Sequence, residues 1–390
     1  MKSTRLYSTL ALACLMALFT PSSAPAQSFK VVHTFQKGTD GENPFTGVIQ
    51  DSEGNHYGTT VYGGTGTYGT AYKLSKTGKE TVLYSFCSKS NCTDGADPEG
   101  GLVEDASGNL YGTASFGGAN NRGIIFKLSS TGQETVLYSF KGGNDGQHPS
   151  GSLIQDSKGN FYGTTIFGGG SADVGTVFRL SKSGKETVLY RFTGGADGAK
   201  PSAGVVADAE GNLYGTAVGG GTSGNGVIFE VSNAGKQSTL YSFTGGSDGG
   251  APASAVIRDT EGNLYGAASS GASGGGTVFE FSSGGTFSVL YTFCSQAGCS
   301  DGSKPLQAVV EDAEGNFYGT TYAGGSDGDG VVFELANTGK ETVLHSFAGT
   351  DGSQPYGGSL LLDASGTLYG TTSQGGGSSC GCGVVFRLTP

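Results

Sequence analysis

The sequence has little charge, and positive charge is the scarcer sign. Only 14% of its 390 residues are charged, with 22 lysines and arginines against 33 aspartates and glutamates, and the formal net charge is −11. A dilute acidic surface has no electrostatic attraction for a phosphate backbone or an anionic bilayer. We therefore expect no nucleic-acid partner and no binding to anionic membranes.

The N-terminus carries an apolar run that is too short to span a membrane. Residues 10–19 follow two basic residues and precede Ala24-Pro25-Ala26. A basic start, a short apolar segment and small residues at the end are typical of a secretory signal peptide. We expect residues 1–26 to be a signal peptide cleaved after Ala26, and the mature chain to be secreted or periplasmic without membrane insertion. Cleavage removes two basic residues and no acidic one, which makes the net charge −13.

Cysteine is scarce, with seven residues, of which Cys14 lies in the expected signal peptide. An even number of cysteines in an exported protein favours disulfides. The other six form three close pairs along the chain, namely Cys87 and Cys92, Cys294 and Cys299, and Cys380 and Cys382. The first two pairs are predicted disulfides. The third would close a very tight ring, and its pairing stays open at this point.

Glycine, by contrast, is abundant, with 74 residues, and 10% of the chain is aromatic. So many aromatic residues favour a turn-rich β protein over a disordered linker. The decapeptide DASGNLYGTA at residues 105–114 recurs in seven close variants, whose tyrosines run from Tyr57 to Tyr369 with a mean spacing of 52 residues. A period of this length indicates a solenoid or a propeller.

Each period contains four short runs with strand character. In the second repeat they cover residues 101–105, 109–114, 123–129 and 134–140. An Asp-x-x-Gly turn joins the first two runs, and Ser-x-x-Gly-Lys-Glu or a close variant joins the last two. Both connections are typical of hairpins. Four antiparallel strands in one period make a propeller blade.

Both ends of the chain carry part of a repeat. Residues 29–35 (FKVVHTF) match a fourth strand such as residues 80–86 (ETVLYSF), and the chain stops after a third strand. An open solenoid would leave these edges unpaired, whereas a ring joins them. We predict an all-β fold in which residues 27–390 form a single seven-bladed β-propeller domain. The N-terminal strand completes the last blade, and the first strands line the channel.

The repeated residues also resemble a known family. The block GNLYGTT, GG, GVFKLS, GKETVLYSF, DG and P recurs in this order across essentially the whole mature chain. It resembles the GloVer (Gloeobacter and Verrucomicrobia) tandem repeat of bacterial surface and secreted proteins. The resemblance implies no particular function. Members often continue into C-terminal anchoring signals, whereas this chain ends in a strand, and we expect no such anchor.

Every period also contains Asp-Gly-x-x-Pro, first at Asp40 and last at Asp351. A ring of carboxylates could bind calcium, and the alternative is a turn between blades. Because sevenfold repetition is what a structural turn requires, we favour the turn. The same reasoning assigns the Asp-x-x-Gly-Asn hairpins to structure, and it assigns His33 and His345, which replace a repeated tyrosine, to packing. None of the four histidines has metal-ligand spacing, and we expect no metal and no cofactor.

Function is better sought where the repeats differ. The loops from fourth to first strand and from second to third strand should share one face, and all six cysteines fall in these loops. Residues 87–93 and 294–300 place seven residues before the Asp-Gly, where the second repeat has four. Either a longer loop needs a clip that limits its entropy, or this face is elaborated for a function.

Four large aromatic residues occur near the Gly-Gly of the second-to-third loops: Tyr62, Phe116, Phe167 and Tyr322. The other three loops carry Val218, Ser270 or Gln374 nearby. Exposed rings offer flat apolar platforms to sugars or peptides, and packing between blades is the alternative. We predict these four residues as the ligand-binding residues.

The favoured hypothesis is a monomeric, secreted, non-enzymatic binding propeller whose partner is a polysaccharide or an envelope protein. An extracellular glycan hydrolase or lyase is the second hypothesis, and it requires paired carboxylates. No unmatched acidic pair stands out in the sequence, and we assign no catalytic residue. A structural envelope protein that assembles with itself or with other surface proteins is the third.

Overall fold

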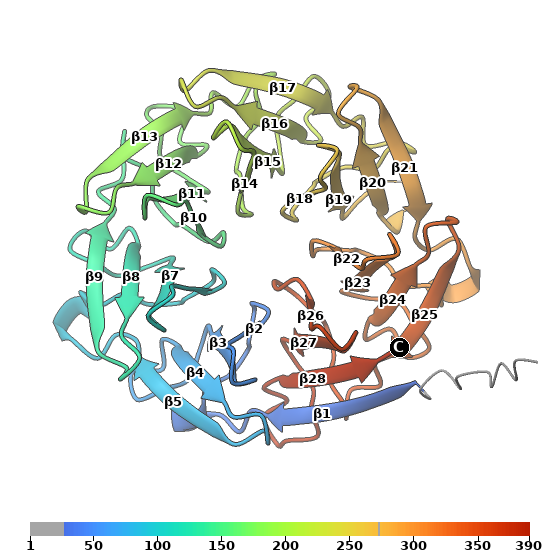
Figure 1. The fold of residues 1–390 in the computed structure, drawn as a ribbon, viewed down its shortest axis with the longest axis horizontal. Helices are drawn as coiled ribbons and strands as arrows, with labels where there is room; N and C mark the ends of the chain where they lie inside the picture. Colours follow the sequence, from blue (N-terminus) through green and yellow to red (C-terminus); the bar gives the residue numbers. More distant parts are fainter. Residues whose placement is uncertain (1–26, 272–273) are drawn as a thin grey trace, which may run out of the picture.

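The computed structural model describes residues 27–271 and 274–390. The expected signal peptide, residues 1–26, lies outside the described residues. Seven four-stranded antiparallel sheets stand around a central axis as the blades of a propeller (Figure 1). The predicted seven-bladed, all-β architecture is therefore confirmed.

From the axis to the rim, six blades use four consecutive strands in chain order, and the last blade takes the first strand of the chain as its outer strand. The first strands, from blade one to blade seven, are β2 (Ile49–Gln50), β6 (Val103–Glu104), β10 (Ile154–Gln155), β14 (Val206–Ala207), β18 (Ile257–Arg258), β22 (Val310–Glu311) and β26 (Leu361–Leu362). The second strands are β3 (His56–Thr60), β7 (Leu110–Ala114), β11 (Phe161–Thr165), β15 (Leu213–Ala217), β19 (Leu264–Ala268), β23 (Phe317–Thr321) and β27 (Leu368–Thr372).

The third strands are β4 (Thr70–Leu74), β8 (Ile124–Leu128), β12 (Thr176–Leu180), β16 (Val227–Val231), β20 (Thr277–Phe281), β24 (Val331–Leu335) and β28 (Val384–Thr389). The fourth strands are β5 (Glu80–Ser85), β9 (Glu134–Ser139), β13 (Glu186–Arg191), β17 (Gln237–Ser242), β21 (Phe287–Thr292), β25 (Glu341–Ser346) and, for the last blade, β1 (Ser28–Thr34). Short 3-10 turns are η1 (Gly38–Asp40), η2 (Ser90–Cys92) and η4 (Ala297–Cys299).

The two ends of the chain close the ring. Strand β1 pairs antiparallel with β28 and forms the outer edge of the seventh blade. The strand ends with Thr34 opposite Val384, and the Phe35 amide then donates a 3.1 Å bond to the Gly383 carbonyl. Closure by the N-terminal strand is as predicted.

The first strands are shorter than predicted. In blade two only Val103–Glu104 pairs with the neighbouring strand, whereas the sequence pattern predicts residues 101–105. The residues before it turn toward the next blade, because the Gly101 amide donates a 3.1 Å hydrogen bond to Ser152 Oγ. Near the axis the blades crowd together, and the backbone bonds across blades instead of along its own sheet.

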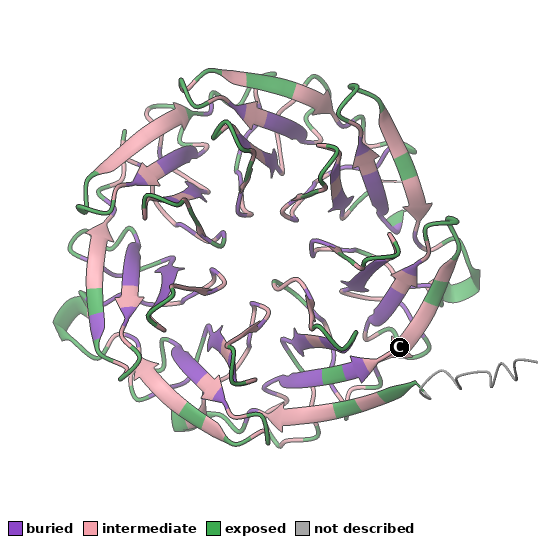
Figure 2. Ribbon diagram, viewed as in Figure 1, coloured by how far each residue is buried: buried purple, intermediate pink, exposed green. Residues whose placement is uncertain are grey.

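The repeated Tyr-Gly-Thr sequence is explained by packing. A Cβ on Gly112 would lie 2.6 Å from the ring of Phe126 in the adjacent strand, so only glycine fits there. Phe126 is fully buried, and its ring meets that of Phe86, from the preceding blade, at 4.9 Å. Each hydrophobic cluster therefore joins two neighbouring blades, and burial is greatest in the second and third strands (Figure 2).

The Asp-x-x-Gly-Asn hairpins have the structural role that was predicted. Asp105 accepts hydrogen bonds from the Asn109 amide, the Asn109 side chain and the Tyr111 hydroxyl, the last at 2.8 Å. These contacts hold the pKa of Asp105 at about 2, although burial alone would raise it. The repeated decapeptide is thus a turn that is fixed by its own side chains.

The Asp-Gly-x-x-Pro turns are held in a similar way. Asp94 is fully buried and accepts a 2.7 Å bond from the Tyr84 hydroxyl of the preceding strand. In the two blades with histidine at that position, the imidazole takes the place of the phenol, with His345 Nε2 at 2.8 Å from Asp351. Within residues 27–271 and 274–390, no group of three or more His, Cys, Asp or Glu side chains is placed to hold a metal ion.

The described part of the chain contains no helix that combines the length and the apolar character of a membrane span.

Candidate functional site

The loops between fourth and first strands and those between second and third strands lie on one face, as predicted. In each blade they are joined by a short antiparallel bridge, for example between Ala96 and Phe116 and between Gln147 and Phe167. These loops surround one mouth of the central channel. The variable loop residues therefore converge on a common surface.

The residue before each loop proline has an unusual backbone conformation. In all seven blades its φ lies between 49° and 58°, a left-handed value that non-glycine residues rarely adopt. Two hydrogen bonds impose it, as shown by His148, whose amide donates to the Arg122 carbonyl at 3.0 Å and whose carbonyl accepts from Ile166 at 3.1 Å. The backbone is constant, but the residues differ: Asn43, Asp97, His148, Lys200, Ala251, Lys304 and Gln354.

Along the loops, the residues that precede the prolines alternate with three of the predicted aromatic residues, namely Tyr62, Phe116 and Phe167. The His148 ring lies edge-on to Phe116 at 4.4 Å and to Phe167 at 5.6 Å, and Lys200 Nζ lies 5.6 Å from the Phe167 ring. Tyr62 is 45% exposed and Phe116 is 36% exposed. Burial and the nearby positive charge of Arg122 lower the pKa of His148. A band of rings and polar groups thus follows the rim of the mouth over blades one to four.

Tyr322 occupies a different position from the other three aromatic residues. The bridge in its blade joins Ser303 to Ala323, so Tyr322 stands one residue earlier and points to the other side of the extended segment. Its hydroxyl donates a 2.9 Å hydrogen bond to Gln354, and its ring meets Tyr356 at 5.9 Å. It therefore faces the channel and not the rim.

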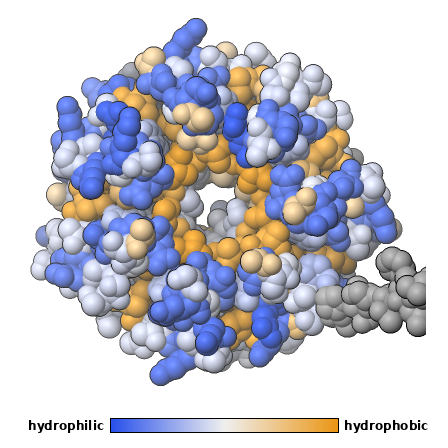
Figure 3. Space-filling view, in the orientation of Figure 1, coloured by the Kyte–Doolittle hydropathy of each residue, from blue (hydrophilic) through white to orange (hydrophobic). Residues whose placement is uncertain are grey.

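A cavity of about 480 Å³ occupies the channel. Figure 3 shows the opening at the centre of the ring, with residues of high hydropathy around it. The residue that follows each loop proline lines the cavity, and it differs among most of the blades: Phe45, Glu99, Ser150, Ser202, Ala253, Leu306 and Tyr356. The cavity wall is therefore asymmetric although the backbone is repetitive.

One side of the cavity is aromatic, and the rest of its wall combines polar and small residues with aliphatic ones such as Leu306. The Phe45 and Tyr356 rings lie 4.6 Å apart, and Tyr356 is 44% exposed. Burial, helped by the Glu99 carboxylate, raises the pKa of Tyr356. Two wall atoms, Ser202 Oγ and Gln307 Nε2, are buried without a hydrogen-bond partner within the described residues. Such buried atoms lack the partner that polar groups in a protein interior usually have.

Asp97 and Glu99 form an acidic pair that the sequence analysis missed. They flank Pro98, and at these two positions no other blade carries an acid. Burial and the Glu99 charge raise the pKa of Asp97 to about 6, and burial also raises the pKa of Glu99. Glu99 accepts a 2.8 Å bond from Ser115, while Asp97 Oδ1 is buried and has no hydrogen-bond partner among the described residues. Comparing the residues around each proline would have shown the exception.

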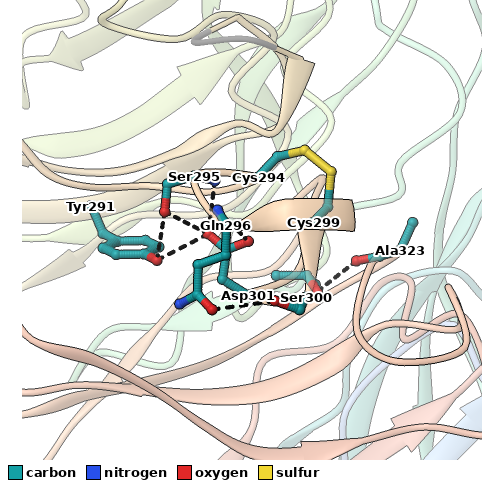
Figure 4. Close-up of a disulfide and its surroundings, with 9 residues drawn as sticks. Tyr291, Cys294, Ser295, Gln296, Cys299, Ser300, Asp301 and Ala323 are labelled. Atoms are coloured by element: carbon teal, nitrogen blue, oxygen red, sulfur yellow. Dashed lines mark hydrogen bonds between the residues drawn. A yellow bond between two sulfur atoms is a disulfide. The ribbon is translucent and has the colours of Figure 1, made fainter.

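The cysteines form three disulfides: Cys87 with Cys92, Cys294 with Cys299, and Cys380 with Cys382. The two predicted pairs are confirmed, and the third, left open by the sequence, is also bonded. Figure 4 shows Cys294 and Cys299 beside Asp301. This aspartate accepts bonds from Ser295 and Tyr291, so the turn is held by hydrogen bonds as well as by the disulfide.

The two loops closed by the disulfides Cys87–Cys92 and Cys294–Cys299 support the rim without lining the cavity. None of the six cysteines is among the cavity residues. The Cys92 carbonyl accepts a 2.9 Å bond from Gly118, two residues after Phe116, and in blade six the Cys299 carbonyl accepts from Gly325. In blade three the same support comes from the Gly143 carbonyl, without a disulfide. The disulfide therefore holds a longer loop where its carbonyl oxygen can accept the same hydrogen bond that a shorter loop accepts without a disulfide.

Comparisons with known structures show the fold. The extracellular domain of a candidate one-component system from B. thetaiotaomicron superposes with a TM-score of 0.58 at 14% identity, over 93% of this chain and 42% of that chain. A candidate 6-phosphogluconolactonase from Bacteroides uniformis superposes with a TM-score of 0.52 at 16% identity, over 81% of this chain and 88% of the other. This chain thus spans less than half of the first of these proteins. No curated protein sequence matches it.

The repeat itself is matched by a family model. The model of the Gloeobacter/Verrucomicrobia repeat matches residues 18–206, 87–273 and 154–386. These three overlapping matches cover nearly all of the chain and agree with the resemblance that the repeated residues indicated. The protein belongs to the Gloeobacter/Verrucomicrobia repeat family.

Proposed function

We propose that this propeller is an exported, non-enzymatic binding protein that holds a polysaccharide segment at the mouth of its channel. The observation that carries the proposal is the asymmetry of the positions flanking the seven loop prolines. The turns around them are fixed by repeated hydrogen bonds, whereas the side chains that they present differ between blades. A purely structural ring has no need for such variation on one face.

The chemistry of the mouth favours a carbohydrate. Tyr62 and Phe116 present exposed rings, which can stack against the apolar face of a sugar. The channel cavity of about 480 Å³ falls within the range of small-molecule sites. Ser202 and Gln307 line this cavity and carry polar side chains of the kind that bond to sugar hydroxyl groups. A concave, asymmetric site also speaks against an envelope protein that uses only an extensive smooth patch.

The experiment uses the purified mature chain with a panel of bacterial and plant polysaccharides. The melting temperature and the fragments released into solution are measured together. A ligand that binds the native state raises the melting temperature. The triple variant Tyr62→Ala, Phe116→Ala and Phe167→Ala should remove this rise while melting cooperatively. The control is Val289→Ala, at an exposed position on the outer strand of blade five, and it should keep the rise.

A glycan hydrolase is the second candidate, and Asp97 with Glu99 is the observation that favours it. An acid with a raised pKa can donate a proton to a leaving group at neutral pH. Under this function the wild-type chain would release fragments, and Glu99→Gln would stop the release without removing the rise in melting temperature. Absence of fragments from every polysaccharide, together with a rise in melting temperature, would exclude hydrolysis of that panel and support binding.

A further inference from the structure

At the junction between the last blade and the first, the last blade carries a pair of like charges that no other blade has at these positions. Lys30 in β1 pairs directly with Arg387 in β28. In the other six blades the corresponding charged residue faces threonine or serine: Lys73 with Thr81, Lys127 with Thr135, Arg179 with Thr187, Glu230 with Ser238, Glu280 with Ser288 and Glu334 with Thr342. Like charges placed opposite each other on neighbouring strands repel and are destabilising.

A buried histidine lies at the same junction. His56 begins the second strand of blade one and is only 4% exposed, whereas the other six blades have leucine or phenylalanine there. Its Nε2 lies 3.1 Å from the Gln50 side-chain nitrogen, and its ring lies 4.2 Å from that of Tyr369 in the last blade. Burial lowers the pKa of His56, although Asp363 and Asp51 oppose this effect.

These residues surround a second cavity. Its volume is about 350 Å³, and its wall includes Lys30, Lys76, Arg387, His56 and Tyr369. Lys30, Lys76 and Arg387 are exposed residues, and within the described ranges none of them forms an ion pair. Three cations thus meet at one cavity in a chain whose net charge is −11.

Two acids act on His56 at this junction, Asp363 and Asp51. Asp51 accepts hydrogen bonds from its own turn, including Asn55 and Tyr57. Asp363 likewise accepts from the amides of Ser365 and Thr367. Both carboxylates keep their charge but are held in their own hairpins, and within the described residues neither forms an ion pair with Lys30, Lys76 or Arg387.

We propose that this junction binds an anionic sugar unit, through a carboxylate or phosphate group held by Lys30, Lys76 and Arg387. The oxyanion would relieve the repulsion between Lys30 and Arg387. The volume, at the lower end of ligand sites, suits a single sugar ring, with Tyr369 as an apolar wall and Gln50 as a hydrogen-bonding group. Because the site joins β1 to the first blade, the ligand would also hold the ring closed.

Calorimetric titration of the mature chain tests the proposal with four probes: glucuronate, glucose 6-phosphate, glucose and inorganic phosphate. Binding of either anionic sugar, without binding of glucose, is the expected result, and the two anionic probes separate a uronic acid from a phosphate ester. Equal binding of glucose would refute the role of charge. Inorganic phosphate binding as tightly as glucose 6-phosphate would refute the role of the sugar ring.

Two variants and a matched control locate the site. Arg387→Glu and Lys30→Thr should each weaken binding at least tenfold. Lys127→Glu makes the same charge change as Arg387→Glu at the same strand position of blade two, and it should leave binding unchanged. Lys30→Thr restores the residue type of other blades, so it should fold and raise the melting temperature of the free protein. Loss of binding in the control, or none in the other two variants, would overturn the assignment.

Discussion

The hydroxyl of Thr371 in the last blade donates a 2.9 Å hydrogen bond to the carbonyl oxygen of Thr46 in the first. Threonines at the same position of blades one to four bond to the next blade in the same way, as Thr164 does to the Ala203 carbonyl at 2.7 Å. The exception is Thr320 in blade six, whose hydroxyl is buried without a partner in the described part of the chain. The blade that follows it has one additional residue between Pro355 and Asp363.

This contrast predicts opposite results for one substitution at two equivalent positions. Thr371→Val should lower the free energy of unfolding by about 1 kcal/mol, because the Thr46 carbonyl loses its partner. Thr320→Val should cost nothing or stabilise the protein, because it removes an unpartnered hydroxyl. Urea unfolding of the two variants beside the wild type measures both values. Equal losses of unfolding free energy in the two variants would show that the hydrogen bond from Thr371 to Thr46 does not stabilise the closure.

The disulfide of blade six should stabilise the protein modestly. Cys294 and Cys299 are five residues apart, and closing so short a loop is worth about 2 kcal/mol on the chain-entropy scale. Asp301 keeps its hydrogen bonds from Tyr291 and Ser295 when the disulfide is absent. The variant Cys294→Ala with Cys299→Ala should therefore unfold cooperatively at lower urea concentration. An unfolded variant would show that the disulfide, and not Asp301, determines the turn.

The sequence was sufficient for the architecture because the repeat is a physical unit. Alternating strand residues, Asp-x-x-Gly turns and two half-repeats at the ends define the strands, the hairpins and the closure. The first strands were predicted too long, because propensity does not show that Gly101 bonds to Ser152 of the next blade. Near the axis, hydrogen bonds to the next blade replace pairing within the sheet, and such contacts between blades cannot be predicted from the sequence of a single repeat.

The candidate site was predicted only in part. The sequence singled out the aromatic residues of the rim, but it grouped Tyr322 with them although Tyr322 faces the other side of its segment, because a shift of one residue reverses an extended segment. Glu99 and Tyr356 were missed because each looks ordinary within its own repeat. Their importance becomes visible only when the seven residues after the prolines are seen to share one cavity.

Substitution of an aromatic residue on the rim and of one that faces the channel should have different effects on the free energy of unfolding. Phe116→Ala, on the exposed rim, should change the free energy of unfolding by less than about 0.5 kcal/mol. Tyr322→Ala should cost about 1–3 kcal/mol, because it leaves Gln354 without its partner and removes the contact with Tyr356. Urea unfolding provides both numbers. A large loss for Phe116→Ala would show that the rim rings are part of the core and would weaken the proposed platform.

The stability of the ring should also decrease as the pH rises from 5 to 8. Glu186 is half-buried beside Asp145, and burial followed by that neighbouring charge raises the pKa of Glu186 from 4.5 to about 8. Burial likewise raises the pKa of Glu80 and of Glu341 to about 7. The folded state therefore retains protons that the unfolded chain releases, and this stabilisation is complete below pH 4.5 and lost by pH 8.

Glu186→Gln tests this assignment, because glutamine reproduces the protonated side chain at every pH. The wild type should melt at a higher temperature at pH 5.5 than at pH 8. The variant should show a smaller difference and should be more stable than the wild type at pH 8, since it carries no carboxylate beside Asp145. Glu210→Gln, at an exposed position, is the matched control and should retain the full pH dependence. If both variants melt like the wild type at pH 8, the Glu186 carboxylate is not repelled in the folded state.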